Sequence, residues 1–194
     1  NLSAFAPSLL ESELFGHVKG AFTGAVGDKI GAIKAAEAGT LFLDEIDSVS
    51  MDIQIKLLLF LESLEYRPVG SIKNVKANVK VIVASGRSLK ELVKANQVRR
   101  DFYFRLSSGH IIKLQSLRDD ENLIKFYMRK YEEENGILIS NNLKEFYMKY
   151  SWPGNIRQLY SHLNKKRSLT NKCKLDMDQH DESLLEMEME NGDF

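Results

Sequence analysis

Cysteine is nearly absent from this 194-residue sequence, in which Cys173 is the only one. A single cysteine excludes an internal disulfide framework and fits a reducing cytoplasm. The four histidines form no cluster at ligand spacing, which argues against a transition-metal site. The 43% hydrophobic composition nevertheless indicates one globular unit with a real core and room for a small second lobe.

The sequence also lacks an excess of charge of either sign and any long apolar run. Lys plus Arg and Asp plus Glu both number 27, so the strongly basic footprint of a nucleic-acid-binding domain is lacking. No stretch approaches the ~18 apolar residues of a membrane span, and no signal peptide opens the chain. The chain begins with Asn1 and not with Met, so we expect it to be a piece of a longer protein.

Apolar patterns predict helices and strands in turn up to about residue 117. Such alternation favours an α/β fold with a parallel sheet. The apolar run at 40–43 ends in acidic residues and has the profile of a buried parallel strand, and 79–84 is a second one. The other expected segments are helices at 8–15, 29–38 (closed by Gly39), 51–64, 88–94 and 99–106, a β-excursion at 66–79 and a third strand at 110–114.

After Leu117 the pattern becomes helical only. Helices are predicted at 119–134, 141–150 and 155 to about 169. The expected divisions are an α/β unit at 1–117, a small helical lobe at 118–170 and an acidic, flexible tail at 171–194. Asn155 is expected to cap the helix after Pro153 and Gly154, and Trp152 to anchor the packing.

Residues 20 to 25 read Gly-Ala-Phe-Thr-Gly-Ala, which predicts a protruding loop. Its glycines permit backbone angles that other residues resist. Phe22 and Thr23 at the tip offer a partner one apolar anchor and one hydroxyl. The candidate partner-binding residues are therefore Gly20, Ala21, Phe22, Thr23, Gly24 and Ala25. The alternative interpretation is an ordinary glycine turn.

Two carboxylates, Asp44 and Glu45, directly follow the strand at 40–43. The carboxyl ends of parallel strands are where such folds bind ligands. The alternative is an acidic helix N-terminus that follows a strand and is favoured by the helix dipole.

The loop resembles the GAFTGA loop of bacterial enhancer-binding proteins, the AAA+ ATPases that activate sigma-54 RNA polymerase, and all six letters match. The segment from Gly39 to Asp47 resembles their Walker B motif. The resemblance covers roughly residues 1–170 and implies an AAA+ P-loop NTPase-like parallel sheet flanked by helices, followed by an α-helical lid. It also implies that Asp44 holds Mg²⁺ through water and that Glu45 polarises the water that attacks ATP.

Five further residues receive a role from the same resemblance. Arg99 and Arg105 match the two arginine-finger positions, which act across a subunit interface in a ring. Arg157, in Trp-Pro-Gly-Asn-Ile-Arg, matches the sensor II residue that reaches nucleotide from the lid. Ser85 stands at sensor I, and Asn1 matches the Asn that pairs with the Walker B Glu. The alternative for the arginines is a surface helix with solvated side chains.

Some features depart from the family pattern. Gly86 replaces the usual sensor I Asn, and no G-x-x-x-x-G-K-[ST] segment occurs in the sequence. That segment supplies the amides and the Lys that hold phosphates. We therefore expect that the chain starts after its own Walker A motif and hydrolyses little ATP by itself. The helix-turn-helix domain common in these activators is also absent, so DNA contact would need a domain outside this chain.

The resemblance predicts an ATP-dependent activator of sigma-54 RNA polymerase with ATP and Mg²⁺ as cofactors. A hexameric or heptameric ring in the cytoplasm would push the loop against sigma-54 to open promoters, with no membrane partner. One alternative is a non-hydrolytic AAA+-fold regulatory or binding module, which Gly86 and the missing P-loop favour. A related AAA+ clamp loader or unloader is a third, but those families lack the loop at 20–25.

Overall fold

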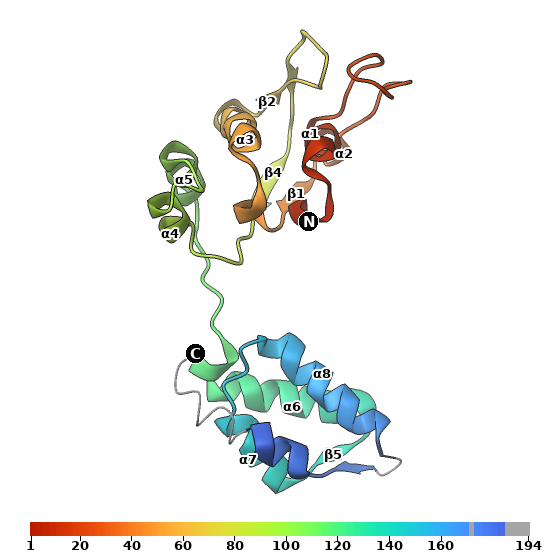
Figure 1. Cartoon of the computed structure of the whole chain (residues 1–194), viewed down its shortest axis with the longest axis vertical. Coiled ribbons are helices and arrows are strands. Elements are labelled where there is room, and N and C mark those ends of the chain that lie inside the picture. The colour runs from red at the N-terminus through yellow and green to blue at the C-terminus, as the bar shows by residue number, and fades with distance from the viewer. Residues whose placement is uncertain (171–172, 185–194) are drawn as a thin grey trace. The chain divides into compact units, whose positions relative to one another are not determined.

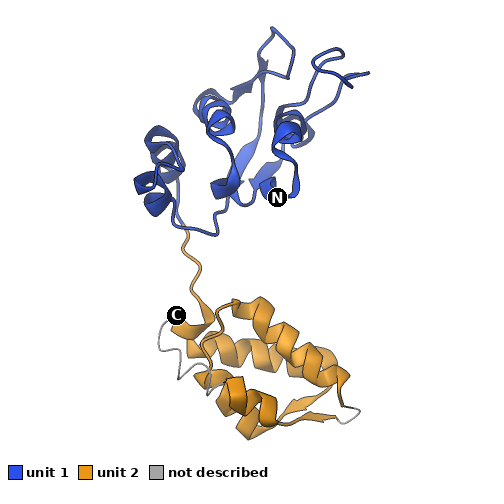
Figure 2. Cartoon of the chain, viewed as in Figure 1, with its two compact units in different colours: residues 1–111 blue, residues 112–194 orange. Residues whose placement is uncertain are grey.

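The computed structural model describes residues 1–170 and 173–184, which form two compact units. The first unit comprises residues 1–111, and the second begins at residue 112 (Figure 2). Each unit has its own cluster of buried apolar side chains. Each therefore has the separate hydrophobic core that defines a domain.

A pair of parallel strands, β1 (Thr40–Leu43) and β4 (Lys80–Val83), lies at the centre of the first unit. Parallel strands need a long crossover connection. Here the crossover includes η2 (Ile46–Ser48), helix α3 (Met51–Ser63) and a β-hairpin (Figure 1). The predicted α/β fold with parallel core strands is thus confirmed.

The two faces of this sheet differ in exposure. Leu41 and Leu43 are buried in a core that also contains Ile33, Leu57, Phe60 and Phe102. Phe42 and Ile82 point to the opposite face, because side chains alternate along a strand. The register places them side by side, and they are 57% and 54% exposed. One face of the sheet is therefore covered, and the other carries two uncovered apolar side chains.

Helices pack around the strands largely where the sequence predicts them. Helix α1 (Pro7–Phe15) has Pro7 in its first turn, where a missing N–H costs nothing. Ser88 caps α4 (Leu89–Lys94) by accepting a hydrogen bond from the Glu91 amide. Helix α5 (Arg100–Ser107) follows, and its Phe102 is fully buried.

The hairpin in the crossover confirms the predicted β-excursion. Strands β2 (Glu65–Tyr66) and β3 (Val75–Lys76) pair antiparallel. Leu64 ends α3 in the left-handed region with φ 55°, which turns the chain into β2. Tyr66 is buried and packs against Phe60 of α3, so the hairpin is attached to this helix.

The helix predicted at 29–38 was wrong in extent, since α2 covers only Ala32–Ala35. Lys29 exchanges two backbone hydrogen bonds with His17, which requires extended backbone. Gly31 then passes so close to the backbone of Gly16 that a Cβ would lie 2.2 Å from the Gly16 nitrogen. Ala38, not Gly39, adopts the left-handed conformation after the helix.

The third strand predicted at 110–114 was also wrong. The segment has no strand or helix assignment, and Ile111, Ile112 and Leu114 are at least 73% exposed. A strand exists only where a neighbour accepts its backbone hydrogen bonds. Within the described ranges, no strand pairs with this segment.

The second unit is mainly helical and begins at residue 112, whereas the helical lobe was predicted at 118–170. Its elements are η3 (Leu117–Asp119), α6 (Glu121–Asn135), β5 (Leu138–Ile139), α7 (Asn141–Lys149), α8 (Asn155–Ser168) and β6 (Lys174–Leu175). Strands β5 and β6 pair in parallel. Each is two residues long, too short for a periodic pattern to reveal it.

Trp152 anchors this unit as predicted. It is 1% exposed, and its indole Nε1 donates to the Tyr147 carbonyl at 2.8 Å. Asn155, in contrast, does not cap α8, whose N-cap is Gly154. Asn155 is already the first helical residue, and its Oδ1 accepts a hydrogen bond from the Leu117 amide at 2.9 Å. Its side chain therefore fixes the entry to the unit.

The flexible tail predicted at 171–194 was wrong for residues 173–184. Residues 173–184 pack on the helical unit, and 171–172 and 185–194 lie outside the described residues. Asp181 is fully buried, 2.5 Å from Lys166 Nζ and 2.8 Å from His162 Nε2. Burial raises the pKa of Asp181, but the hydrogen bonds from His162 and Lys166 outweigh it and lower that pKa to about 2. The buried carboxylate is therefore ionised at neutral pH.

Lys166→Ala should strongly destabilise the second unit. The substitution removes the cation that contacts Asp178 and Asp181, and breaking a buried ion pair by removing one partner costs about 3–5 kcal/mol. Trp152, the only tryptophan, reports unfolding of this unit by fluorescence in urea. Lys165→Ala, an exposed neighbour on the same helix, is the control and should change the free energy of unfolding by less than about 0.5 kcal/mol. Equal urea midpoints for the two variants would contradict the assignment.

Candidate functional site

Asp44 and Glu45 lie at the carboxyl end of β1, as the sequence predicts, and both are half-buried. The Asp44 Oδ1 accepts a hydrogen bond from the Glu45 amide at 2.9 Å. The Asp44 carbonyl accepts another from the Leu2 amide at 3.0 Å. The N-terminal segment is thereby fixed against the two carboxylates.

Asn1 contacts this carboxylate pair, and Ser3 assists it. The Asn1 Nδ2 lies 3.5 Å from Asp44 Oδ2, and its Oδ1 accepts from the Ser3 amide and hydroxyl, both at 2.9 Å. The hydrogen bond from the Ser3 side chain, and next that from Asn1, lower the pKa of Glu45 below its ordinary value. Sequence reasoning expected only Asn1 here. The only sequence signal for Ser3 was a hydroxyl two residues after Asn1.

Glu45 itself has an uncommon backbone conformation. Its φ of 56° and ψ of 45° lie in the left-handed region, which costs a side-chain-bearing residue about 1 kcal/mol or more. The conformation persists because the chain is held at Glu45 and directly after it. Ile46 donates to the Ala84 carbonyl at 3.0 Å, and the Ser48 hydroxyl donates to the Glu45 carbonyl at 2.7 Å.

Asp47 and Arg87 form an ion pair that the sequence did not reveal. The Arg87 Nε donates to Asp47 Oδ2 at 2.7 Å, and the Gly86 amide donates to Asp47 Oδ1 at 3.2 Å. Burial raises the pKa of Asp47, but the hydrogen bond from Arg87 and smaller contributions lower it overall. The ion pair joins the segment after β1 to the segment after β4.

Ser85, the predicted sensor I residue, lies within this connection. Its hydroxyl donates to the Arg87 carbonyl at 2.8 Å. It also helps to lower the pKa of Asp47. Its hydrogen-bonding capacity is therefore already engaged by the chain itself.

The donor set at this edge fits magnesium only in part. Mg²⁺ usually takes one or two carboxylates and completes its shell with water and phosphate oxygens. Asp44 can supply the carboxylate. No group of three or more metal-ligating side chains occurs in the described part of the chain. The residues present can thus serve a metal that arrives with nucleotide phosphates, but the sequence holds no phosphate-binding loop.

The two predicted arginine fingers have partners within the first unit. Arg99 forms a two-pronged pair with Asp101, at 3.1 and 2.7 Å, on the surface. Arg105 donates from Nε and Nη2 to the Leu61 carbonyl near the end of α3. Within residues 1–111 no hydrogen bond joins either arginine to Asp44 or Glu45, so the structure does not bring these residues together.

Arg157 belongs to the second unit, in the first turn of α8. Its side chain is exposed and forms no ion pair with any residue that the structure describes. The predicted contact with nucleotide therefore remains a prediction. The neighbouring Gln158 has a local role, since its Oε1 accepts from the Gly154 amide at 2.8 Å.

The loop at 20–25 projects from the first unit beyond α1 (Figure 1). Gly20 and Gly24 have φ of 81° and 99°, so both use the left-handed freedom predicted for them. The Gly20 amide donates to the Ala25 carbonyl at 2.8 Å and closes the loop. Phe22 and Thr23 are exposed at the tip, whereas Ala25 is 7% exposed. Of the six predicted residues, Gly20, Phe22, Thr23 and Gly24 are exposed.

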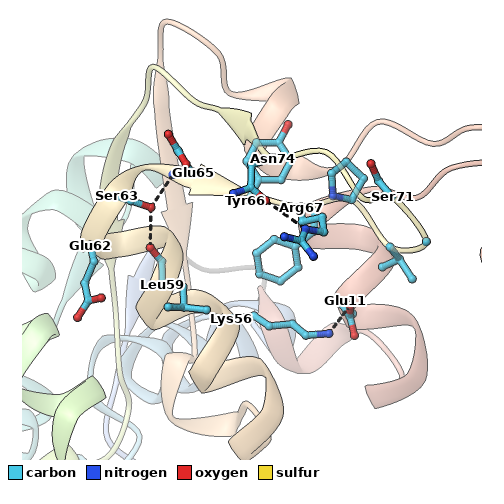
Figure 3. Close-up of a pocket in the computed structure, with 14 residues that line it drawn as sticks. Glu11, Lys56, Leu59, Glu62, Ser63, Glu65, Tyr66, Arg67, Ser71 and Asn74 are labelled. Carbon is cyan, nitrogen blue, oxygen red and sulfur yellow. Dashed lines mark hydrogen bonds and ion pairs between the residues drawn. The ribbon is translucent and has the colours of Figure 1, made fainter.

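The base of this loop contacts the hairpin. Val18 donates to the Val69 carbonyl at 3.1 Å, and a Cβ on Gly70 would lie 2.6 Å from the Ala21 Cβ. A cavity of about 610 Å³ lies beside this contact, lined by α1, α3 and hairpin residues such as Lys56, Tyr66 and Arg67 (Figure 3). Neither Asp44 nor Glu45 lines it, so this cavity is separate from the carboxylate site.

Two family models match the chain. The Sigma-54 interaction domain matches residues 1–112, and the AAA+ ATPase lid domain matches residues 106–193. None of the helices in the described ranges has the length and apolar character needed to cross a membrane.

Two bacterial regulatory proteins are similar in sequence to most of this chain. The Nif-specific regulatory protein of Klebsiella pneumoniae is 41% identical over 184 residues, which cover 92% of this chain and 35% of that protein. The Sigma54-dependent transcriptional activator SfnR of Pseudomonas putida is 41% identical over 166 residues, which cover 82% of this chain and 45% of SfnR. The chain thus spans less than half the length of these relatives.

A solved structure supports the same relationship. NtrX from Brucella abortus, in complex with ATP, matches with a TM-score of 0.73 and 29% identity. The match covers 88% of this chain and 38% of NtrX. The likeness therefore includes fold and sequence together.

Ser3→Ala should raise the pKa of Glu45 towards its ordinary value, because the Ser3 hydroxyl is the largest cause of its lowering. With a depressed pKa the carboxylate stays ionised to lower pH, so in the variant protonation should begin at higher pH. Carbon-13 NMR titration of the Glu45 carboxyl measures this. Ser50→Ala, an exposed serine whose side chain does not cap α3, should leave the titration unchanged. An unaltered Glu45 titration in Ser3→Ala would contradict the hydrogen bond between the Ser3 hydroxyl and the Glu45 carboxylate.

Proposed function

Because this chain belongs to the Sigma-54 interaction domain family of AAA+ proteins, we propose that it is the part of a sigma-54 activator that couples ATP hydrolysis to movement of the loop at 20–25. One observation carries the proposal: the first unit holds a paired carboxylate site at a parallel strand end and also presents Phe22 and Thr23 on an exposed loop. Sigma-54 is the proposed partner of that loop.

The carboxylate site supplies the chemistry in this proposal. Bound Mg²⁺ would polarise the phosphate oxygens of ATP. Asp44 would hold the metal through water, and Glu45 would orient the attacking water once Asn1 and Ser3 release its carboxylate. The low pKa of Glu45 keeps it ionised and therefore able to accept a hydrogen bond from that water. The ATP complex of the related NtrX supports a nucleotide here.

The arginines and the lid complete the proposed site. A surface ion pair such as Arg99–Asp101 is worth little, so Arg99 can exchange Asp101 for a phosphate of a neighbouring subunit in a ring. Arg105 would have to leave the Leu61 carbonyl to do the same. Arg157 is exposed and would reach nucleotide from the lid. We place the protein in the cytoplasm with RNA polymerase, and assign DNA contact to a domain outside this chain.

A non-hydrolytic binding module is the second candidate. The observation that favours it is the engagement of Ser85 with Arg87 and Asp47, together with Gly86 in place of an amide side chain. A hydroxyl engaged in this way is less available to a γ-phosphate. In that case the loop would still bind a partner, but Glu45 would be dispensable.

Glu45→Gln should lower ATP turnover by roughly 10² or more while ATP still binds, since the amide cannot accept a proton from water. The assay needs a chimera in which this chain replaces the matching 166-residue segment of SfnR; we propose that the remainder of SfnR supplies the phosphate-binding loop. Glu62→Gln, an exposed glutamate on α3, is the matched control. Equal turnover for both variants, or no hydrolysis by the unsubstituted chimera, would favour the binding module.

Mixing two inactive chimeras tests the ring. Arg99→Ala removes the proposed finger, and Glu45→Gln removes the water-orienting group. A mixed interface pairs an intact Arg99 with an intact Glu45, so ATPase activity should recover in part. Size-exclusion chromatography with light scattering verifies that mixed rings form. Mixed rings without recovery would place the arginine within its own subunit's site or outside catalysis.

Thr23→Ala in the chimera should retain most ATPase activity but fail to bind sigma-54 in the presence of ADP and aluminium fluoride, a transition-state mimic. Phe22→Ala should be equally damaging, because it deletes the apolar anchor at the tip. A native gel detects co-migration with sigma-54. Val26→Ala, an exposed residue just after the loop, should bind normally. Normal binding by both tip variants would mean that the loop is structural.

A further inference from the structure

Phe22, the apolar residue at the loop tip, is folded back onto its own loop. Its side chain is only 42% exposed. Its ring packs against the His17 imidazole with the centroids 5.0 Å apart and the planes at 69°. This edge-to-face arrangement is a favoured geometry for aromatic pairs. Part of the surface that a partner would bury is therefore already covered by the chain.

His17 is itself held rigidly. Its Nδ1 lies 2.7 Å from the Ser12 hydroxyl, and Ser12 is 5% exposed on α1. Its backbone exchanges two hydrogen bonds with Lys29, at 3.0 and 2.8 Å. The imidazole is thus fixed to the body of the unit by its side chain and by its backbone.

The loop base is supported from its other side by the hairpin. Val69 donates to the Gly16 carbonyl at 2.9 Å and accepts from the Val18 amide. Val69 and Gly70, which also line the cavity described above, therefore belong to the fixed base. The tip, by comparison, is tied by its own turn hydrogen bonds and by the ring contact with His17.

We propose that His17 is a positioning residue: fixed by Ser12, it holds Phe22 against the loop base, and partner binding requires this ring pair to separate. The inference rests on the proposed function, because that function gives the separation of the two rings its role in partner binding. The contact between His17 and Phe22 can itself be tested without nucleotide or sigma-54. The free energy of an edge-to-face pair is large enough that its loss should change the fraction of molecules with Phe22 away from His17 by roughly two- to tenfold.

Chymotrypsin digestion of the 194-residue chain measures opening at Phe22. His17→Gln keeps a group that can hydrogen-bond to Ser12 but removes the ring, so cleavage after Phe22 should become roughly two- to tenfold faster. His17→Phe keeps a ring but loses the hydrogen bond with Ser12, so its cleavage rate after Phe22 should lie between those of His17→Gln and the unsubstituted chain. His110→Gln, the same substitution at an exposed histidine, should match the unsubstituted rate. Equal cleavage in His17→Gln and His110→Gln would overturn the proposal.

A second measurement covers the case in which His17→Gln lowers the thermal midpoint. In the unsubstituted chain, NMR should show a nuclear Overhauser effect between the Phe22 ring protons and the His17 Hδ2. Its absence would overturn the proposal even if digestion of the variant were uninterpretable.

The SfnR chimera connects this contact to binding. His17→Gln should increase sigma-54 binding in the absence of the transition-state mimic by roughly two- to tenfold, while Thr23→Ala abolishes it. Loss of binding in Thr23→Ala with no gain in His17→Gln would reject the positioning role and leave the proposed function intact. Normal binding by Thr23→Ala would reject the proposed function, and the digestion result would stand independently.

Discussion

The candidate site depends on the parallel pairing of β1 and β4. Ala84 donates to the Leu43 carbonyl at 2.9 Å and accepts from the Ile46 amide at 3.0 Å, so the pairing continues past both strand ends. Parallel strands finish at the same edge. For this reason two segments about forty residues apart meet there, one with the carboxylates and one with Ser85. The Asp47–Arg87 ion pair then joins them into one rigid edge.

Helix α1 joins the two functional parts of the first unit. Asn1 and Ser3, which precede it in the sequence, contact the carboxylates, and the loop at 20–25 follows it. Its Ser12 contacts His17. A helix of nine residues resists bending, so displacement at one end must move the other. This continuity offers a physical route between the proposed chemistry and the proposed movement, and it requires no contact through the sheet.

Local patterns predicted much of the fold, and long-range contacts account for the misses. The strand at 40–43 and the helix after it were predictable because their local apolar patterns agree with the contacts that they make in the fold. The segment at 110–114 has the composition of a strand but lacks a neighbour within the described ranges. Lys29 is not helical as predicted, because its backbone N–H and C=O are hydrogen-bonded to His17. The roles of Ser3, Asp47 and Arg87 were not predicted. Each depends on a hydrogen bond to a residue about forty positions away, and such a contact produces no periodic pattern in the sequence.

The uncovered face of the sheet has a practical consequence for handling the protein. Phe42 and Ile82 form a small apolar surface on two strands whose register is fixed. Adjacent exposed apolar side chains favour self-association, which increases with protein concentration and with salts that strengthen hydrophobic contacts. Storage at low concentration and without sulfate therefore suits this chain, and a charged residue at position 42 or 82 should raise its solubility limit.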